Sequence, residues 1–391
     1  MSLAVVNIGD SHRGSLDGAP IPGDAVVCED GAIAWIGRSG DVARGDVRTL
    51  VDAGGAALVP GFIDSHVHLA FGDYTPRQRT VGFLESYLHG GVTTAISASE
   101  VHVPGRPTDV AGVMALAVAA QRAYQDYRPG GVRAYGGSVI LEPGLEERHF
   151  RELREAGVWL AKAGFGSFTR AEDYVATVRA ARQAGLKVMC HCGGASIGGT
   201  LEVIDAELLL AMRPDVLGHV NGGPTSLSPE DGERLVREAT ESALQLVHAG
   251  NLRSAIHLAG LAIATGQESR LLIASDTPTG TGVIPLAILR SMAELVSLGP
   301  LSPAVALAAA TGNVSQTYGL AEGILDVGRP ADLLLIDAPV GSQAADWRAA
   351  LAVGDLPAVG LAVTAGKIRF TRSRNTPPPR SRIEVSPSGG E

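Results

Sequence analysis

Eight apolar segments separated by helical periodicity constrain the fold of this chain more than any other feature. They occupy residues 59–66, 91–99, 132–141, 158–163, 187–192, 216–221, 243–248 and 271–276. Amphipathic or alanine-rich segments lie between them, including residues 110–124, 171–184, 229–239 and 254–265. Parallel strands need such crossovers, and closing eight strands into a barrel leaves no exposed edge. The pattern predicts an α/β protein with a (β/α)8 barrel of the TIM type.

The two ends of the chain have a different character, because both are short strands joined by turns. Near the start, Asp30-Gly31 is a hairpin signal between two such strands, and near the end a turn is expected at Ala365-Gly366. We therefore predict a small discontinuous β-sandwich domain from residues 1–58 and 321–370, with the barrel at 59–320. Residues 371–391, which contain three consecutive prolines, are expected to form an extended C-terminal arm.

The composition limits the kinds of molecule that the chain is expected to bind. Of the 391 residues, 45% are hydrophobic and 50 are glycine, which fits an enzyme with many tight βα turns. The net charge of −9 provides no basic field for nucleic acid or a membrane surface, so a small-molecule substrate is expected. Three cysteines are too few for a disulfide framework, and no basic-then-apolar leader is visible at the start. These features predict a cytoplasmic protein.

Polar residues recur where the predicted strands end, which is where a βα barrel builds its site. They are His66 and His68 on the first segment, then Lys162, His191, His219 and Asp276. Burying four imidazoles, an ammonium and a carboxylate without partners would cost several kcal/mol per charge, whereas a metal cluster removes that objection. Each residue also has a structural alternative: a satisfied core histidine, a solvated lysine or a helix N-cap.

With these residues at its strand ends, the chain resembles a known family, the amidohydrolase superfamily of metal-dependent hydrolases. The resemblance covers nearly the whole chain, including the split β region and the segment Gly323 to Asp332. Within the superfamily, five passages are similar to a branch of ring-opening hydrolases: residues 72–78, 88–94, 104–107, 219–225 and 373–378.

The resemblance implies two divalent metal ions, with zinc as the default and iron or manganese as alternatives. His66 and His68 would hold the more buried ion, and His191 and His219 the second. Asp276 would bind the first ion, take a proton from the attacking water and pass it to the leaving nitrogen. A strand-four side chain would bridge both ions.

Two departures from the family pattern stand out. The resembling branch carries a glutamate on strand four, where this sequence offers only Lys162, so we expect a carboxylated, bridging lysine as in many other relatives. Strand seven ends in His248, a position the family's ligand sets skip, so we predict that His248 contacts substrate rather than metal. A plain surface histidine is the alternative.

Further substrate contacts are expected from loops near the barrel mouth, although hydrogen bonds that anchor the loops are an equal alternative. The candidate residues are Tyr74, Arg77, His102, Arg106 and Asn221.

The sequence thus predicts a hydrolase that cleaves a C–N bond of a cyclic amide or enamide with a metal-activated hydroxide. One alternative is a cyclase that uses the same site to form a cyclic amidine from an amine and an amide with loss of water. A second is a non-catalytic relative that uses the fold only for assembly. Related enzymes are commonly homo-oligomers, and we expect the same here.

Overall fold

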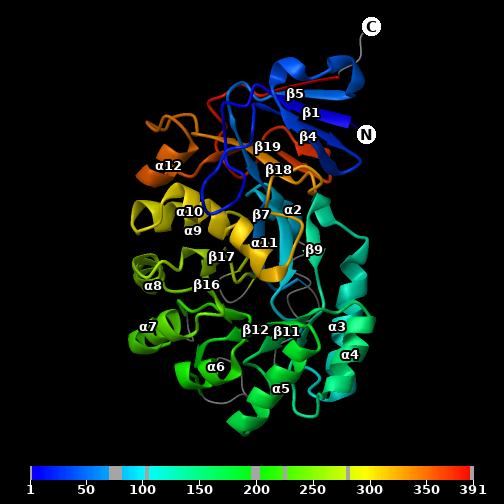
Figure 1. Ribbon diagram of the computed structural model, residues 1–391, viewed down its shortest axis with the longest axis vertical. Helices are drawn as coiled ribbons and strands as arrows, with labels where there is room; N and C mark the ends of the chain where they lie inside the picture. Colours follow the sequence, from blue (N-terminus) through cyan, green and yellow to red (C-terminus); the bar gives the residue numbers. More distant parts are fainter. Residues whose placement is uncertain are drawn as a thin grey trace.

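The computed structural model describes residues 2–69, 82–101, 105–194, 203–222, 227–278 and 282–387. Its strands form two regions stacked along the long axis, a β region containing both chain ends and a larger region of alternating strands and helices (Figure 1). The larger region corresponds to the predicted βα units.

The strands of the larger region lie parallel and follow one another in sequence order. They are β7 (Phe62–Val67), β8 (Val92–Ser97), β9 (Arg133–Tyr135), β10 (Ser138–Ile140), β11 (Leu160–Ala163), β12 (Lys187–His191), β15 (Val216–Gly218), β16 (Ala243–Val247) and β17 (Leu271–Ala274). A parallel bridge between Val67 and Thr277 brings the last strand beside the first. This arrangement is of the TIM-barrel type.

Strand three is interrupted, although the sequence predicted one strand over 132–141. It divides into β9 and β10 at Gly136-Gly137, where the chain passes close to the helix that precedes it. A Cβ added at Gly136 or Gly137 would lie 2.8 or 2.7 Å from the carbonyl oxygens of Ala120 and Ala117. The close approach breaks the ladder and explains why both positions are glycine.

The lumen is filled by one apolar side chain from each of these strands except β10. These are Ile63, Ile96, Tyr135, Leu160, Met189, Val216, Ala243 and Leu272. Tyr318, from α11 (Gly312–Tyr318), packs into the same cluster. Because side chains alternate along a strand, the residues two positions further on also face the lumen, including Lys162, His191 and Gln245.

Helices cover the outside of the strands, and several begin at a capping side chain such as Asp109, Ser228 or Asn251. They are α2 (Phe83–Leu88), α3 (Val110–Gln125), α4 (Glu147–Glu155), α5 (Ala171–Gln183), α6 (Ala206–Met212), α7 (Pro229–Glu238), α8 (Leu252–Ala264), α9 (Ala287–Ser297) and α10 (Pro303–Ala309). A further helix, α12 (Trp347–Val353), packs on α9 and α10. Short 3-10 turns lie at Ser39–Asp41, Arg44–Asp46, Pro129–Gly131 and Glu268–Arg270. A small pair, β13 (Gly193–Gly194) and β14 (Val203–Ile204), follows β12.

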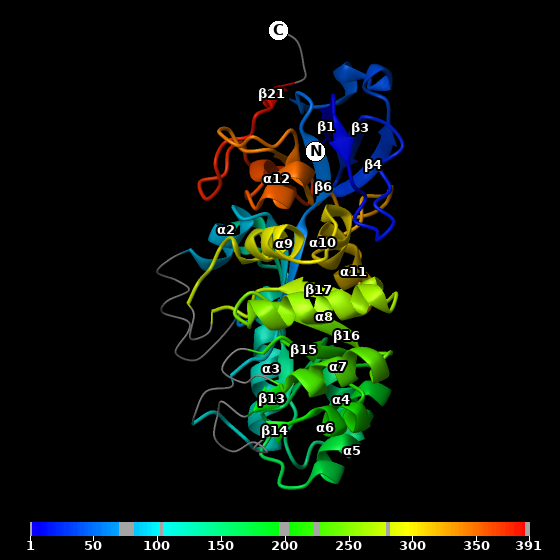
Figure 2. The same cartoon turned by 90° about the vertical axis from the view of Figure 1, so that its left-hand side faces the viewer.

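The β region at the other end contains two five-stranded sheets. One has the order β21-β5-β1-β3-β4 and the other β2-β6-β18-β19-β20. Their bounds are β1 (Ser2–Val6), β2 (Asp10–Ser11), β3 (Ala25–Glu29), β4 (Ala32–Gly37), β5 (Thr49–Asp52), β6 (Ala57–Pro60), β18 (Leu333–Asp337), β19 (Ala358–Thr364), β20 (Lys367–Phe370) and β21 (Glu384–Pro387). One apolar cluster joins side chains from both sheets. In both views α9 and α10 lie between this region and the barrel strands (Figure 2).

The expected hairpin turns are present in this region. Asp30 and Gly31 have φ angles of 47° and 89°, and Ala365 and Gly366 have 48° and 69°. The segment predicted as an arm runs along the same region, and β21 pairs antiparallel with β5.

The predicted first barrel strand, 59–66, is two strands in the structure. β6 pairs with β18 in the terminal sheets, whereas β7 pairs with β8. The chain changes sheet at Gly61, where an added Cβ would lie 2.0 Å from Oγ1 of Thr93. Val59 and Pro60 therefore belong to the β region, two residues beyond the predicted boundary.

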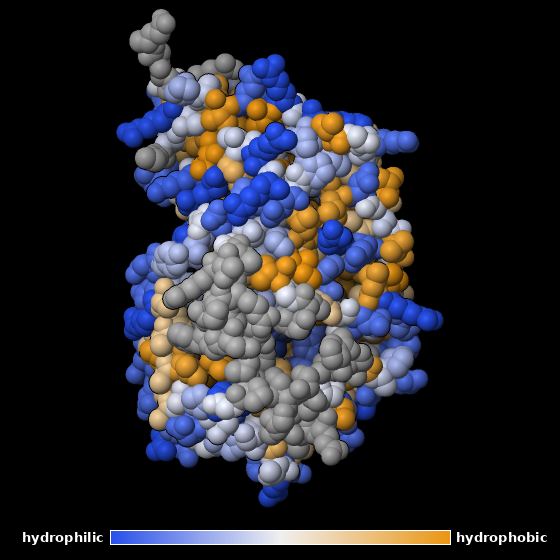
Figure 3. Space-filling view, turned by 180° about the vertical axis from the view of Figure 1, so that it is seen from behind, coloured by the Kyte–Doolittle hydropathy of each residue, from blue (hydrophilic) through white to orange (hydrophobic). Residues whose placement is uncertain are grey.

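The surface seen from behind mixes hydrophilic and hydrophobic patches (Figure 3). Large exposed apolar side chains include Leu298 at the end of α9 and Val353 at the end of α12. Within the described ranges, no helix has the length and apolar character needed to span a bilayer.

Candidate metal centre

His66, His68 and Asp276 converge at the carboxyl ends of β7 and β17. Their ligand atoms all lie within 4.8 Å of one another. Oδ1 of Asp276 is 3.3 Å from Nε2 of His66 and 3.2 Å from Nε2 of His68. Both imidazoles are buried, whereas the Asp276 side chain is 18% exposed and so remains open to the mouth.

A β-bulge turns the two histidines inward. Ile63 faces the lumen, so strict alternation would point residues 65 and 67 the same way and His66 outward. Between Asp64 and Val67, however, β7 has one residue more than β8, which shifts the remaining side chains to the other face. Oδ1 of Asp64 accepts from the backbone N–H groups of His66 and Ser275, at 3.2 and 3.0 Å, and thereby stabilises the bulge.

The hydrogen bonds of His66 fix its tautomer. Nδ1 lies 2.6 Å from Oε1 of Gln245, an acceptor, so Nδ1 carries the proton and Nε2 has a free lone pair. That lone pair faces the carboxylate oxygen of Asp276. Two acceptors at 3.3 Å repel each other unless a positive charge lies between them, and a divalent cation would supply it.

His191 and His219 form a second pair beside the first. Their ring centroids are 4.5 Å apart, and the His219 ring is 5.5 Å from that of His66. Nε2 of His191 bonds the carbonyl oxygen of Gly194 at 3.0 Å. In the part of the chain that the structure describes, Nδ1 of each is buried without a hydrogen-bond partner. Unpartnered imidazole nitrogens of this kind fit a metal ligand set.

Lys162 lies beside His66 and is fully buried. Its Nζ is 3.5 Å from Nε2 of His66 and 3.4 Å from Sδ of Met189. It therefore points into the lumen and away from solvent, which excludes the alternative of a solvated lysine. Neither contact neutralises an ammonium ion.

Two of the predicted ligands have unusual backbone conformations. His219 has φ 42° and Asp276 has φ 56°, in the left-handed region that non-glycine residues rarely adopt. Leu217 packs outside the barrel and Val216 inside, so regular alternation would point His219 outward, and the left-handed turn redirects it. Such strain costs of order 1–3 kcal/mol per residue and is typical of functional sites.

The electrostatics match metal ligation. Burial lowers the pKa of His66 and His219 well below the ordinary value, and that of His191 to about 4. Burial works to raise the pKa of Asp276, but the nearby His66 and His68 hold it well below its usual range. Burial also lowers the pKa of Lys162. Neutral imidazoles and an ionised carboxylate are the forms that bind metals.

The predicted substrate contacts have different outcomes. Tyr74, Arg77 and His102 lie outside the described residues. His248 does not face the lumen: Leu246 packs in the outer core, and Nδ1 of His248 is 3.1 Å from Oγ of Ser291 on α9. The imidazole therefore contacts α9, and a contact between His248 and substrate stays a prediction.

Asn221 and Arg106 are held by structural contacts. The Asn221 amide donates to the carbonyl of Val247 and accepts from its N–H, both at 2.9 Å, which ties the turn after β15 to β16. Arg106 pairs with buried Glu142. For both residues the loop-anchoring alternative describes the observed contacts.

Gln245 and Ser99 were not found from the sequence. Gln245 bonds His66, and Oγ of Ser99 is 3.4 Å from Nδ1 of His68. Gln245 had a readable signal, since it is the one polar residue in the strand Ala-Leu-Gln-Leu-Val. Ser99 had none, because it lies among other small polar residues.

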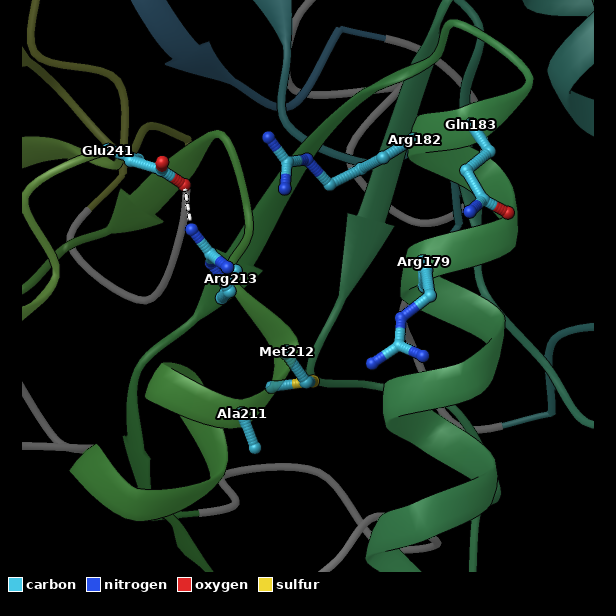
Figure 4. A pocket seen from close by; sticks show the side chains of 7 residues that line it. All are labelled: Arg179, Arg182, Gln183, Ala211, Met212, Arg213 and Glu241. Carbon is cyan, nitrogen blue, oxygen red and sulfur yellow. Dashed lines mark hydrogen bonds and ion pairs between the residues drawn. The ribbon is translucent and has the colours of Figure 1, made fainter.

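A cavity of about 440 Å³ lies at the other end of the strands (Figure 4). It is lined by the carboxyl ends of α5 and α6 and includes Arg179, Arg182, Arg213 and Glu241. Arg213 pairs with Glu241, and Arg182 pairs with Asp215. The predicted ligands do not line it, so we place the reaction at the histidine cluster.

Comparison with known proteins identifies the class. Residues 57–359 match the model of the Amidohydrolase family, and the chain belongs to this family. It is 41% identical to enamidase of Eubacterium barkeri over 387 residues, covering 98% of this chain and all of that protein. The crystal structure of enamidase, also 41% identical, covers 99% of this chain and all of that one with a TM-score of 0.93.

More distant relatives show how far the likeness extends. Adenine deaminase 3 of Rhizobium meliloti is 27% identical over 336 residues, covering 81% of this chain and 52% of that protein. An amidohydrolase crystal structure that is 16% identical covers 96% of this chain and all of that one with a TM-score of 0.65, which shows the fold alone. Family membership therefore rests on the family model and on enamidase.

Proposed function

We propose that this chain is a binuclear metal-dependent hydrolase that opens a C–N bond in a cyclic amide or enamide. The observation that carries the proposal is the convergence of His66, His68 and Asp276 beside a second histidine pair. Similarity to enamidase over the full chain supports the substrate class.

Asp276 is the residue we assign to proton transfer. Two divalent ions bound here would activate water and polarise the scissile carbonyl. The Asp276 carboxylate is ionised and partly open to the mouth, so it can accept the proton of the attacking water and deliver it to the leaving ring nitrogen. Gln245 orients His66, which keeps its Nε2 available.

The proposed bridge is a carboxylated Lys162. A neutral lysine amine adds CO2 and releases one proton to give a carbamate, and burial that lowers the pKa of Lys162 favours the neutral amine. The carbamate would be anionic and could serve both histidine pairs. Zinc suits this mixed imidazole and carboxylate set, and iron or manganese would also fit.

The cyclase alternative rested on the changed strand-four bridge and on His248 as a substrate contact. The second of these is weakened, because the His248 imidazole bonds Ser291 on α9. The assembly-only alternative predicts a protein that binds no transition metal.

We also propose a division into a β-sandwich of residues 1–58 and 321–370, a closed barrel of 59–320 and an arm of 371–391. The pairing of β6 with β18 supports the discontinuous sandwich, with its boundary shifted to Gly61. The pairing of β21 with β5 joins part of the proposed arm to the sandwich sheet.

We expect a cytoplasmic homo-oligomer. The three cysteines are buried free thiols, as suits a reducing compartment. Exposed Leu298 and Val353, 66% and 62% accessible, are suited to contacts between copies. Light scattering after size-exclusion chromatography would measure the assembly, and a monomer would contradict this expectation.

The function is tested by metal analysis together with a substrate panel. The purified protein should contain about two transition-metal ions per chain and should hydrolyse six-membered lactams and enamides with mass gain of one water. Mass loss of one water from β-aminoalkyl amides would instead establish the cyclase. Absence of bound transition metal and of turnover would support the assembly-only alternative.

A further inference from the structure

A buried ion pair lies beside the proposed metal centre without touching its ligands. Arg106, 7% exposed, pairs with Glu142, which is fully buried at the end of strand three. An isolated buried pair is weak evidence for stability, because desolvation offsets the attraction. The role of the pair is therefore better judged from the other contacts that Arg106 and Glu142 make.

Those contacts go to the backbone of the loop that follows β11. The Arg106 guanidinium donates to the carbonyl of Phe165 at 2.7 Å, and the second oxygen of Glu142 accepts from the N–H of Ser167 at 2.7 Å. From the other side, the Tyr174 hydroxyl accepts from the N–H groups of Gly164 and Gly166. The loop is thus held at four consecutive residues.

The loop needs such anchors because it is rich in glycine and closely packed. Gly164 has φ 102°, and a Cβ there would lie 2.4 Å from Cβ of His191. At Gly166 an added Cβ would lie 2.1 Å from the carbonyl oxygen of Leu141. A chain of this kind has little intrinsic preference for one conformation, so side chains from elsewhere must select it.

The anchored loop places Phe165 against two of the proposed metal ligands. Its ring centroid is 4.6 Å from that of His191 and 5.5 Å from Nζ of Lys162. The ring therefore covers one ligand of the second pair and the proposed bridge, and limits the orientations that either side chain can adopt.

We propose that Arg106 and Glu142 form a positioning pair that holds Phe165 against His191 and Lys162 and so sets the affinity of the second metal ion. This inference rests on the proposed binuclear function. It reassigns Arg106 from substrate contact to positioning residue. The three residues hold ligands in place and take no part in bond making or breaking.

The test measures binding of two Zn²⁺ ions by chelator competition in three variants. The double variant Arg106→Leu/Glu142→Leu removes both charges, so no unpaired buried charge is left to unfold the protein. Phe165→Leu keeps apolar volume but removes the ring, with the ion pair intact. The matched control is the exposed pair, Arg213→Leu/Glu241→Leu, whose side chains are 62% and 64% exposed.

We expect the second Zn²⁺ to bind about 10–100-fold more weakly in the double variant and in Phe165→Leu, with the affinity for the first ion unchanged, as for supporting residues generally. The control should bind both ions like the wild type. Wild-type affinity for both ions in Phe165→Leu and in the folded double variant would overturn the inference and leave the proposed function standing. A wild-type protein that binds no Zn²⁺ would remove both.

Discussion

The two halves of the candidate centre are organised differently. The half formed by His66, His68 and Asp276 lies where the last strand meets the first, and backbone hydrogen bonds lock it. Asp276 donates its N–H to the carbonyl of His66, and His68 donates to that of Thr277, both at 2.9 Å. The half formed by Lys162 and His191 depends instead on side-chain anchoring of a glycine-rich loop.

This difference indicates that the first ion site is preorganised by the strand pairing and the second by contacts added to it. A change in the first half should therefore weaken the first ion site and lower turnover. A change in the second half should weaken binding of the second ion and leave the first ion bound.

The largest effect is expected from Asp276→Asn. The amide keeps the size of the side chain but cannot accept the proton, and it weakens the first ion site. Turnover should fall by about 10²–10⁴-fold, the contribution typical of a general acid–base. Steady-state kinetics at saturating metal measures it, and activity within a few-fold of the wild type would exclude Asp276 from proton transfer.

Lys162→Ala should remove the second ion and spare the first. Without an anionic bridge, two cations at close range repel each other, so we expect about one metal per chain and a fall in turnover on the order of 100-fold. Elemental analysis counts the ions. Lys187→Ala, at the opposite end of β12, serves as the control. Two retained ions in Lys162→Ala would show that Lys162 is not the bridge.

Gln245→Leu should weaken the first ion by about 10–100-fold, because His66 loses the acceptor that fixes its tautomer. Competition with a chelator, read separately for each ion, would show the loss at the first site. An equal loss at both sites would mean that the two halves are not separately organised.

The smallest effect is expected at the cavity lined by arginines. Arg213 forms an exposed ion pair with Glu241, so Arg213→Ala should change the free energy of unfolding by less than about 1 kcal/mol. Denaturant titration and kinetics measure the two effects. A large fall in turnover would show that the cavity takes part in the reaction after all.

Much of the fold could be predicted from the sequence because its signals are local. Apolar runs and helical periodicity located the strands and helices, and Asp30-Gly31 and Ala365-Gly366 marked two hairpins. The break at Gly136-Gly137 depends on a helix that packs against the strand. The change of sheet at Gly61 depends on Thr93, on another strand. Neither partner is visible in the local pattern.

The site shows the same division. Residue type and position at strand ends found the six proposed ligands, but not the bulge after Asp64 that turns His66 inward, because a bulge is a relation between two strands. The contact of His248 with Ser291 was not predicted for a related reason, since it depends on how α9 packs beside the end of β16. Arg106 was recognised as a residue of interest, but its partner Glu142 became evident only from the packing.

The central claim, that side chains from separate strands share two cations, is tested most directly by a crystal structure of the metal-loaded protein with anomalous scattering. We predict two peaks. One should lie about 2.0–2.2 Å from Nε2 of His66 and His68, the other at a similar distance from His191 and His219. Electron density should extend from Nζ of Lys162 toward both. Peaks remote from these imidazoles, or none, would contradict the account.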